Sequence, residues 1–506
     1  MRISRILLPV GCCVAAVAAG WFMATEGNII TSVVRMAAVA GFFVSVVSPR
    51  LGLYVLVGMA AYLDCVKRFI ILPTGGASMT DVASVLGAAP VTFAGVCIGV
   101  FVGKILKHVS MDRRDRFLFF AVAATEIVLA ASAYRGYRNS GSMSVLAGFA
   151  GGGVYVPLVL VMGLVFRTRE ELLNFIYFAL LIFAPVAFYG IWQAKFGFTR
   201  LEYQYLASGL TQTAGNLDDL RPRPFSTLSS PHAFAVTMAI LFLLTLLLVK
   251  KTARPRFDPG GLFLKYLLPL LYFTASLASF VRSGWAVWMF GLLGMLFFRG
   301  RARTLFFYGG FVVSLVLVVF NADVLLDRLG DLQALLPSGN SFFTSAFRLE
   351  TYSARLYSYQ NLLNNGDLWT WFGNSSLAAS RVVQNNELSH DAITQTLVSF
   401  GVVGLAIILY VGVASFAWLH ERVLRLRAGR ERAWGVGLLS ILAGIMASGL
   451  LTGNHLAVYP LSFLFWALAG TLVRHIRLNE EPALAQEPLY SPARDVGAAR
   501  GAPLFS

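Results

Sequence analysis

Long apolar runs that alternate with short polar segments dominate the chain. A helix needs about 20 mainly apolar residues to cross the hydrocarbon core of a bilayer, and windows of that size predict about 14 transmembrane helices, or 12–14 because two runs are short. The predicted spans are residues 6–24, 29–47, 51–63, 83–103, 117–134, 145–166, 172–192, 232–249, 264–281, 284–298, 304–320, 394–419, 434–451 and 456–473. The hydrophobic pattern therefore predicts an all-α polytopic integral membrane protein.

The composition excludes a soluble enzyme. Hydrophobic residues make up 57% of the 506 residues and charged residues 13%, whereas soluble domains average about 45–50% and about 25%. The four cysteines show no spacing typical of a metal site or a disulfide framework. The net charge of +16 is high, and such basicity indicates either a nucleic-acid partner or an anionic membrane surface.

The position of the basic residues decides between these two partners. Cytoplasmic segments of membrane proteins carry an excess of Lys and Arg. With the N-terminus inside, the segments predicted inside hold 27 of the 41 Lys and Arg residues and carry the whole excess of +16. The segments predicted outside sum to zero. The charge pattern therefore predicts cytoplasmic N- and C-termini, and it removes the need for a nucleic-acid partner.

Spans and loops divide the chain into six parts, two of which are long outside loops. The parts are the N-terminal transmembrane helices (1–192), the first long loop (193–231), the central transmembrane helices (232–320), the large loop (321–393), the C-terminal transmembrane helices (394–473) and the cytoplasmic tail (474–506). Two long loops on one side of a helical body predict a site at the outer membrane–water boundary.

Two arginine-containing stretches on the outside are candidates for binding an anion. Arg221 and Arg223 stand between prolines in RPRPFSTLSSPHAFA, where the backbone is extended. Arg282 lies between two apolar runs with almost no loop around it, a position that costs free energy unless the charge snorkels or pairs. Guanidinium groups bind phosphate oxygens in a bidentate manner. The alternative is that these arginines are solvated or snorkel at helix ends.

The large loop supplies a further arginine and a histidine. Arg355 begins an amphipathic stretch, and His390 and Asp391 lie at the start of the span 394–419. A histidine at a helix start commonly caps the helix or is solvated, but histidine is also the side chain best suited to accept a proton near neutral pH. Arginines beside a histidine at a membrane surface favour an anionic lipid substrate, with the arginines offsetting the charge of a diphosphate leaving group. These stretches contain no carboxylate cluster such as DxD, so a metal is not required.

These stretches resemble the O-antigen ligase and Wzy-type O-antigen (exopolysaccharide) polymerase superfamily. The similar motifs run in order from about residue 195 to 420: Arg223 to Pro231-His232, Val281-Arg282-Ser283-Gly284, Arg355 followed by Phe372-Gly373-Asn374, and His390-Asp391 followed by Leu397, Gly401 and Gly404. Two positions depart from the family pattern, since His232 and Asp391 stand where asparagine is usual. Asp391 could orient or charge-couple His390, or cap the helix.

The resemblance implies a GT-C-like fold in the bacterial inner membrane, with the long loops in the periplasm. It implies a glycosyltransferase without cofactor or metal that polymerises or transfers oligosaccharide from undecaprenyl diphosphate. His390 would be the base or position the acceptor, Arg223, Arg282 and Arg355 would hold the diphosphate, and Arg221, His232 and Asp391 would support them.

The partners implied by the resemblance are the lipid-linked glycan, membrane lipid and other envelope polysaccharide assembly proteins. The acceptor would be a lipid-linked repeat unit in a polymerase, which we favour, or lipid A–core in a ligase. The sugar, the linkage and the oligomeric state are left open. A transporter or flippase for the same lipid-linked substrate is the alternative from another class, although the two halves of the chain lack the matching interruptions that internal repeats give.

Overall fold

The structure is a computed structural model that describes residues 29–70, 79–105, 113–141, 149–208, 223–249, 266–306, 309–310, 313, 370–373, 392–453 and 455–485. Among these residues, nine helices are long and apolar enough to cross a membrane. They are α2 (Ile29–Val47), α3 (Pro49–Phe69), α4 (Met79–Ile105), α5 (Arg113–Ser140), α8 (Arg169–Phe196), α10 (Pro231–Val249), α20 (Ala392–Arg425), α21 (Arg430–Thr452) and α22 (Leu461–Ala485). The described part of the chain is all-helical, which confirms the prediction of a multi-pass membrane protein.

The structure does not show all of the 14 predicted spans. Nine of the predicted spans correspond to the nine long helices, whereas the predicted spans 264–281 and 284–298 correspond to the shorter helices α12 (Leu268–Ala278) and α13 (Arg282–Phe297). The predicted span 145–166 is broken into η1 (Gly153–Tyr155) and α7 (Leu158–Val165), because it contains three consecutive glycines and a proline, which disfavour a continuous helix. The predicted span 6–24 and most of 304–320 lie outside the described residues.

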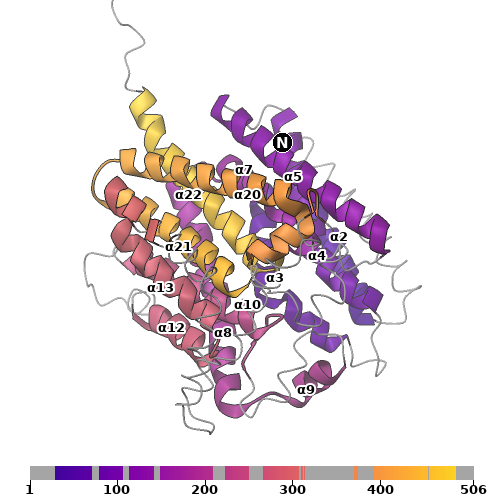
Figure 1. Cartoon of the computed structure of the whole chain (residues 1–506). Coiled ribbons are helices and arrows are strands. Elements are labelled where there is room, and N and C mark those ends of the chain that lie inside the picture. Colours follow the sequence, from indigo (N-terminus) through magenta and orange to yellow (C-terminus); the bar gives the residue numbers. More distant parts are fainter. Residues whose placement is uncertain are drawn as a thin grey trace, which may run out of the picture.

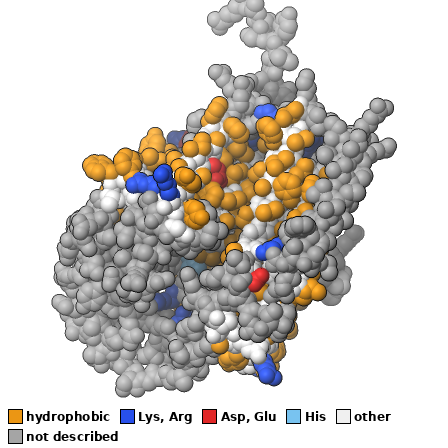
Figure 2. Space-filling model, turned by 90° about the vertical axis from the view of Figure 1, so that its right-hand side faces the viewer, with side chains coloured by type: hydrophobic (Ala, Val, Ile, Leu, Met, Phe, Trp, Pro, Cys, Tyr) orange, Lys and Arg blue, Asp and Glu red, His pale blue; other side chains and the backbone are white. Residues whose placement is uncertain are grey.

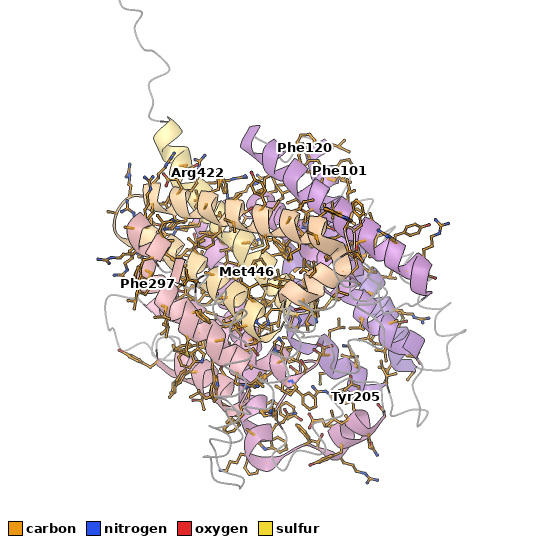
Figure 3. The ribbon with its side chains drawn as sticks, in the orientation of Figure 1. Phe101, Phe120, Tyr205, Phe297, Arg422 and Met446 are labelled. Atoms are coloured by element: carbon orange, nitrogen blue, oxygen red, sulfur yellow. The ribbon has the colours of Figure 1, made fainter. Side chains whose placement is uncertain are left out.

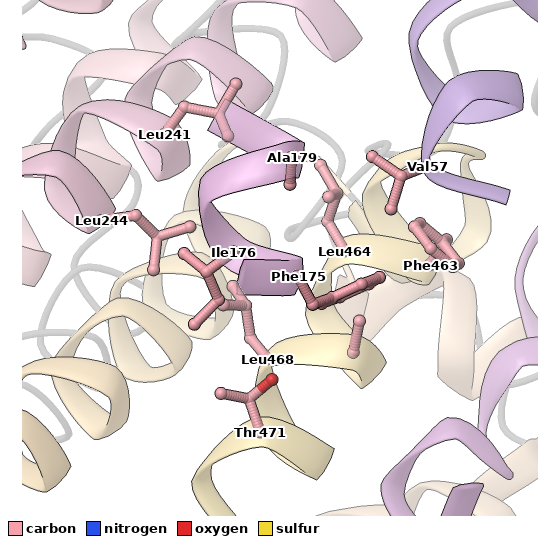
Figure 4. Close-up of a pocket in the computed structure, with 11 residues that line it drawn as sticks. Val57, Phe175, Ile176, Ala179, Leu241, Leu244, Phe463, Leu464, Leu468 and Thr471 are labelled. Carbon is pink, nitrogen blue, oxygen red and sulfur yellow. The ribbon is translucent and has the colours of Figure 1, made fainter. Parts of the chain in front are cut away.

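Helix α10 is the centre of the C-terminal half of the bundle. It packs against α12, α13 and α21, while α2, α3 and α4 pack together on the other side and α8 contacts α3, α10 and α12 (Figure 1). The side chains of α10 are apolar around most of the helix and nearly all of them are buried, as expected for a central helix. A cavity of about 30 Å³ lies between α3, α8, α10 and α22, and Thr471 alone contributes a polar side chain to its lining (Figure 4). This volume is only about that of a water molecule, so the cavity is too small for a glycan.

The outer surface of the described helices is largely apolar. Figure 2 shows hydrophobic side chains covering most of the described part of one face. Phe101 on α4 and Phe120 on α5 are 63% and 69% exposed, and both point outward (Figure 3). Exposed apolar side chains in such numbers are stable against lipid, which agrees with a membrane-embedded bundle.

Ion pairs join the helix ends at one end of the bundle. They are Arg50–Glu171 (2.7 Å), Arg169–Glu431, Arg301–Glu421 and Arg422–Glu480 (2.8 Å). These pairs connect the starts of α3, α8 and α21 with the ends of α20 and α22 and with the segment after α13. All of these segments belong to the side that the charge pattern predicts to be inside. These paired helix ends therefore lie at one end of the bundle, which we call the basic end.

Helix α20 is bent near its start, at Gly401. The backbone there has a positive φ of 72°, a conformation that costs glycine little. The segment 370–373 lies against the bend, since Val402 N and Val403 N donate to Thr370 O and Trp371 O at 3.0 and 3.2 Å. A Cβ atom on Gly373 would lie 2.4 Å from Gly401 N. Gly373 and Gly401 are therefore in direct contact.

Candidate functional site

The segment from Arg223 to Ser230 forms a buried turn at the end of the bundle opposite the basic end. Gln193, near the end of α8, holds the turn through its amide oxygen, which accepts from Phe225 N at 3.2 Å and Ser226 N at 2.6 Å. Ser226 adopts a positive φ of 52°, and its hydroxyl donates to Val186 O at 2.5 Å. A non-glycine residue keeps this conformation only when its surroundings impose it. The turn is therefore a defined structure rather than the solvated loop that its prolines and serines suggest.

Arg68 at the end of α3 holds the other side of the turn. Its guanidinium donates to Leu228 O at 3.0 Å and to Ser226 O, and it lies 4.4 Å from the centre of the Phe225 ring. It also pairs with Glu202 of α9 (Arg200–Ala207) at 2.8 Å. Both side chains are only 2% exposed. Any arrangement of the helices that separates Arg68 from Glu202 leaves a buried charge unpaired, which costs free energy. The pair therefore favours the arrangement seen here.

Glu202 links this ion pair to α8. One carboxylate oxygen accepts from Tyr189 Oη at 2.9 Å and from Gln193 Nε2 at 2.5 Å, and the other accepts from Thr199 N at 2.8 Å in a capping box at the start of α9. Gln193 thus joins the carboxylate to the turn. The helices α3, α8 and α9 and the turn before α10 share one network of hydrogen bonds.

The starts of α10 and α13 meet beside this turn. Ser230 caps α10, accepting from Ala233 N at 3.1 Å, and Pro231 occupies the first helical position, where no hydrogen bond is lost. Helix α13 begins at Arg282, and Gly284 lies so close to α10 that a Cβ atom would be 2.8 Å from Ala235 O. The small residue therefore sets how closely the two helix starts approach.

Two histidines and two serines join these helix starts to α21. His232 Nδ1 lies 2.9 Å from Ser283 Oγ, and His232 Nε2 lies 2.9 Å from His455 Nδ1. His455 Nε2 lies 2.9 Å from Ser448 Oγ, which in turn donates to Ser283 O at 3.0 Å. We call these four residues the histidine network.

The histidine network is largely buried. Ser283, Ser448 and His455 are buried, whereas His232 keeps part of its surface. Removal from water lowers the pKa of His455 well below its usual range, and the neighbouring His232 lowers it further. His455 is therefore neutral at physiological pH.

Three of the seven predicted site residues lie within the described part of the chain. Arg223 begins the buried turn, His232 lies in the first turn of α10, and Arg282 is the first residue of α13. The bond between His232 and Ser283 brings the neighbourhoods of His232 and Arg282 together. The predicted residues Arg221, Arg355, His390 and Asp391 lie outside the described residues.

Sequence reasoning missed the residues that hold this region together. Asp64, Lys67 and Arg68 in YLDCVKRF recur at helical spacing directly after an apolar run, which marks a polar helix face rather than a loop. The spacing of Thr199 and Glu202 is that of a capping box. His455, in contrast, has no local signal, because its partner His232 is 223 positions away.

The arrangement is suited to binding an anion. Helix N-termini carry partial positive charge, and here two of them converge beside Arg282, with Arg223 at the start of the adjoining turn. No group of three His, Cys, Asp or Glu residues that could hold a metal ion occurs within the described ranges.

Comparison with known proteins adds no assignment: no protein-family model matches the chain, and no curated protein matches it.

Proposed function

We propose that the protein is a glycosyltransferase facing the periplasm that polymerises or transfers oligosaccharide carried on undecaprenyl diphosphate. Polymerisation is favoured, with a lipid-linked repeat unit as acceptor, and transfer to lipid A–core is second. The observation that carries the proposal is the convergence of the α10 and α13 N-termini beside Arg282. Helix N-termini together with arginine bind phosphate groups, and a diphosphate is the charged part of this substrate.

The proposed chemistry needs charge stabilisation and one proton acceptor. Arg223, Arg282 and Arg355 bind the diphosphate and offset the charge that develops as it leaves, so arginines do what a metal ion does in other transferases. His390 takes the acceptor proton or positions the acceptor hydroxyl. Arg221, His232 and Asp391 support these groups.

The proposed orientation places the site in the periplasm and both termini in the cytoplasm of a bacterium, within the inner membrane. Support comes from the basic end, where ion pairs hold four arginines at neighbouring helix ends: Arg50, Arg169, Arg301 and Arg422. Lys and Arg accumulate on the cytoplasmic side of membrane proteins. The site at the opposite end therefore faces outward, where glycan acceptors and envelope assembly proteins are present.

Substitution of His390 tests the proposal. We expect His390→Ala to reduce glycan transfer by about 10²-fold or more, because general-base catalysis and acceptor positioning contribute factors of this size. The measurement is polymer length on lipid-linked repeat units, compared at equal protein level. His108→Ala, in a segment predicted to be cytoplasmic, is the matched control and should leave polymer length unchanged. Normal polymer from His390→Ala at normal protein level would remove His390 from the mechanism.

A further inference from the structure

Each hydrogen bond in the histidine network has a defined donor and acceptor, and the bonds of Ser448 determine the others. A serine hydroxyl has one hydrogen, and a carbonyl oxygen can only accept. Ser448 Oγ therefore donates to Ser283 O at 3.0 Å and accepts from His455 Nε2–H at 2.9 Å. Thr452 Oγ1 lies farther from Ser448 Oγ, at 3.2 Å, and its own hydroxyl donates to Ser448 O at 2.8 Å.

The bonds of Ser448 determine the proton positions on both histidines. A neutral imidazole has one donor and one acceptor nitrogen, so His455 Nδ1 accepts from His232 Nε2–H. His232 Nδ1 is then the acceptor for the hydroxyl of Ser283. A hydroxyl thus points its proton at an imidazole that a third group orients, which is the arrangement of an activated nucleophile or a proton relay.

We propose that His232 is a proton-accepting group of this site, that the Ser283 hydroxyl relays the proton to it, and that His455 is the positioning residue that orients His232. The inference rests on the proposed glycosyl transfer, and it assigns the destination of the acceptor proton. His390 is then left with the other role, positioning the acceptor hydroxyl.

The proposed step is balanced in atoms and charge. The acceptor oxygen attacks the anomeric carbon of the glycan, a new C–O bond forms, and the bond from that carbon to the diphosphate oxygen breaks. The bonding electrons leave with undecaprenyl diphosphate, beside Arg282. The acceptor proton passes to Ser283 Oγ while the Ser283 proton moves to His232 Nδ1. His232 becomes an imidazolium that still donates from Nε2 to His455.

The surroundings of the two histidines suit these different roles. His232 keeps part of its surface and adjoins Arg282 through Ser283, whereas His455 is 1% exposed. Burial keeps the pKa of His455 low, so His455 stays neutral and its Nδ1 keeps accepting from His232. An acceptor at this position stabilises the imidazolium, as the third member of a catalytic triad does.

Kinetics of single variants test the inference with purified protein and lipid-diphosphate-linked glycan. We expect His232→Gln to lower kcat by about 10²-fold with little change in KM, because glutamine hydrogen-bonds but cannot accept a proton. Ser283→Ala should lower kcat in the same way. His420→Gln is the matched control, since His420 is a buried histidine at the basic end that hydrogen-bonds Thr304, and its kcat should equal that of the wild type.

Position 455 separates positioning from packing. His455→Gln keeps an acceptor for His232 and should retain much more activity than His455→Leu, which has none. The inference is overturned if His232→Gln turns over like the wild type, or if the two variants at 455 lose activity equally. If the wild-type protein forms no glycosidic bond from this substrate, the proposed function itself fails and the inference falls with it.

Discussion

Replacing Arg68 by methionine should lower the free energy of unfolding by about 3–5 kcal/mol, because it leaves the buried Glu202 carboxylate without its cation. Methionine keeps much of the side-chain volume, so the loss comes mainly from the charge and the hydrogen bonds. The guanidinium also binds Ser226 O and Leu228 O, so the turn before α10 loses its anchor. The measurement is unfolding of the purified protein in mild detergent with increasing SDS.

Two further variants make the Arg68 result specific. Arg50→Met breaks an ion pair whose arginine is 42% exposed, and it should cost about 0–1 kcal/mol, the usual contribution of an exposed pair. Adding Glu202→Gln to Arg68→Met should restore part of the lost stability, because a neutral amide leaves no buried charge. Equal costs for Arg68→Met and Arg50→Met would contradict the role assigned to the buried pair.

Replacing Arg282 by lysine should reduce glycan transfer by about 10²-fold while the protein folds normally. Lysine keeps the positive charge but lacks the planar fork that binds two phosphate oxygens at once, and loss of one stabilising donor commonly costs this much in kcat. Arg282 begins α13, so in the proposed site the helix N-terminus and the guanidinium both contribute to binding the diphosphate. The measurement is the initial rate of transfer from lipid-linked glycan.

The control for Arg282 comes from the segment after the same helix. Arg299 follows α13 at the basic end, where its Nε donates to Met295 O, so Arg299→Lys makes the same change far from the site. We expect Arg299→Lys to transfer at the wild-type rate. Full activity in Arg282→Lys would show that no bidentate contact to a phosphate exists at this position.

Hydropathy predicted the long helices well, but it failed where polar residues are buried or where the backbone breaks. The predicted span 51–63 stops before Asp64, whereas α3 continues to Phe69, because Asp64 pairs with Lys67 and Arg68 with Glu202 inside the bundle. A scale that assigns a fixed cost to each charge cannot recognise that these charges are paired, either within α3 or with the distant Glu202. In residues 145–166 hydropathy made the opposite error. The run is apolar enough to be predicted as one helix, but its glycines and proline interrupt the helix.

Sequence motifs indicated three residues of the candidate site but not the partners that these residues contact. The resemblance indicated Arg223, His232 and Arg282 through local motifs, but the contact between His232 and His455 spans 223 positions and depends on the packing of α10 against α13 and α21. Likewise, Gln193 reads as one polar residue at the end of a span, and only the fold reveals that it holds the turn before α10. Side-chain partners from distant helices require the three-dimensional structure.

The proposed site forms covalent glycosidic bonds, and a reconstitution tests this activity directly. The purified protein is placed in lipid vesicles with undecaprenyl-diphosphate-linked oligosaccharide that carries a label on its sugar. We predict longer labelled glycans together with release of undecaprenyl diphosphate, and loss of both with Arg282→Lys. Movement of the labelled lipid between the two leaflets without any new glycosidic bond would rule out a glycosyltransferase and identify the protein as a transporter.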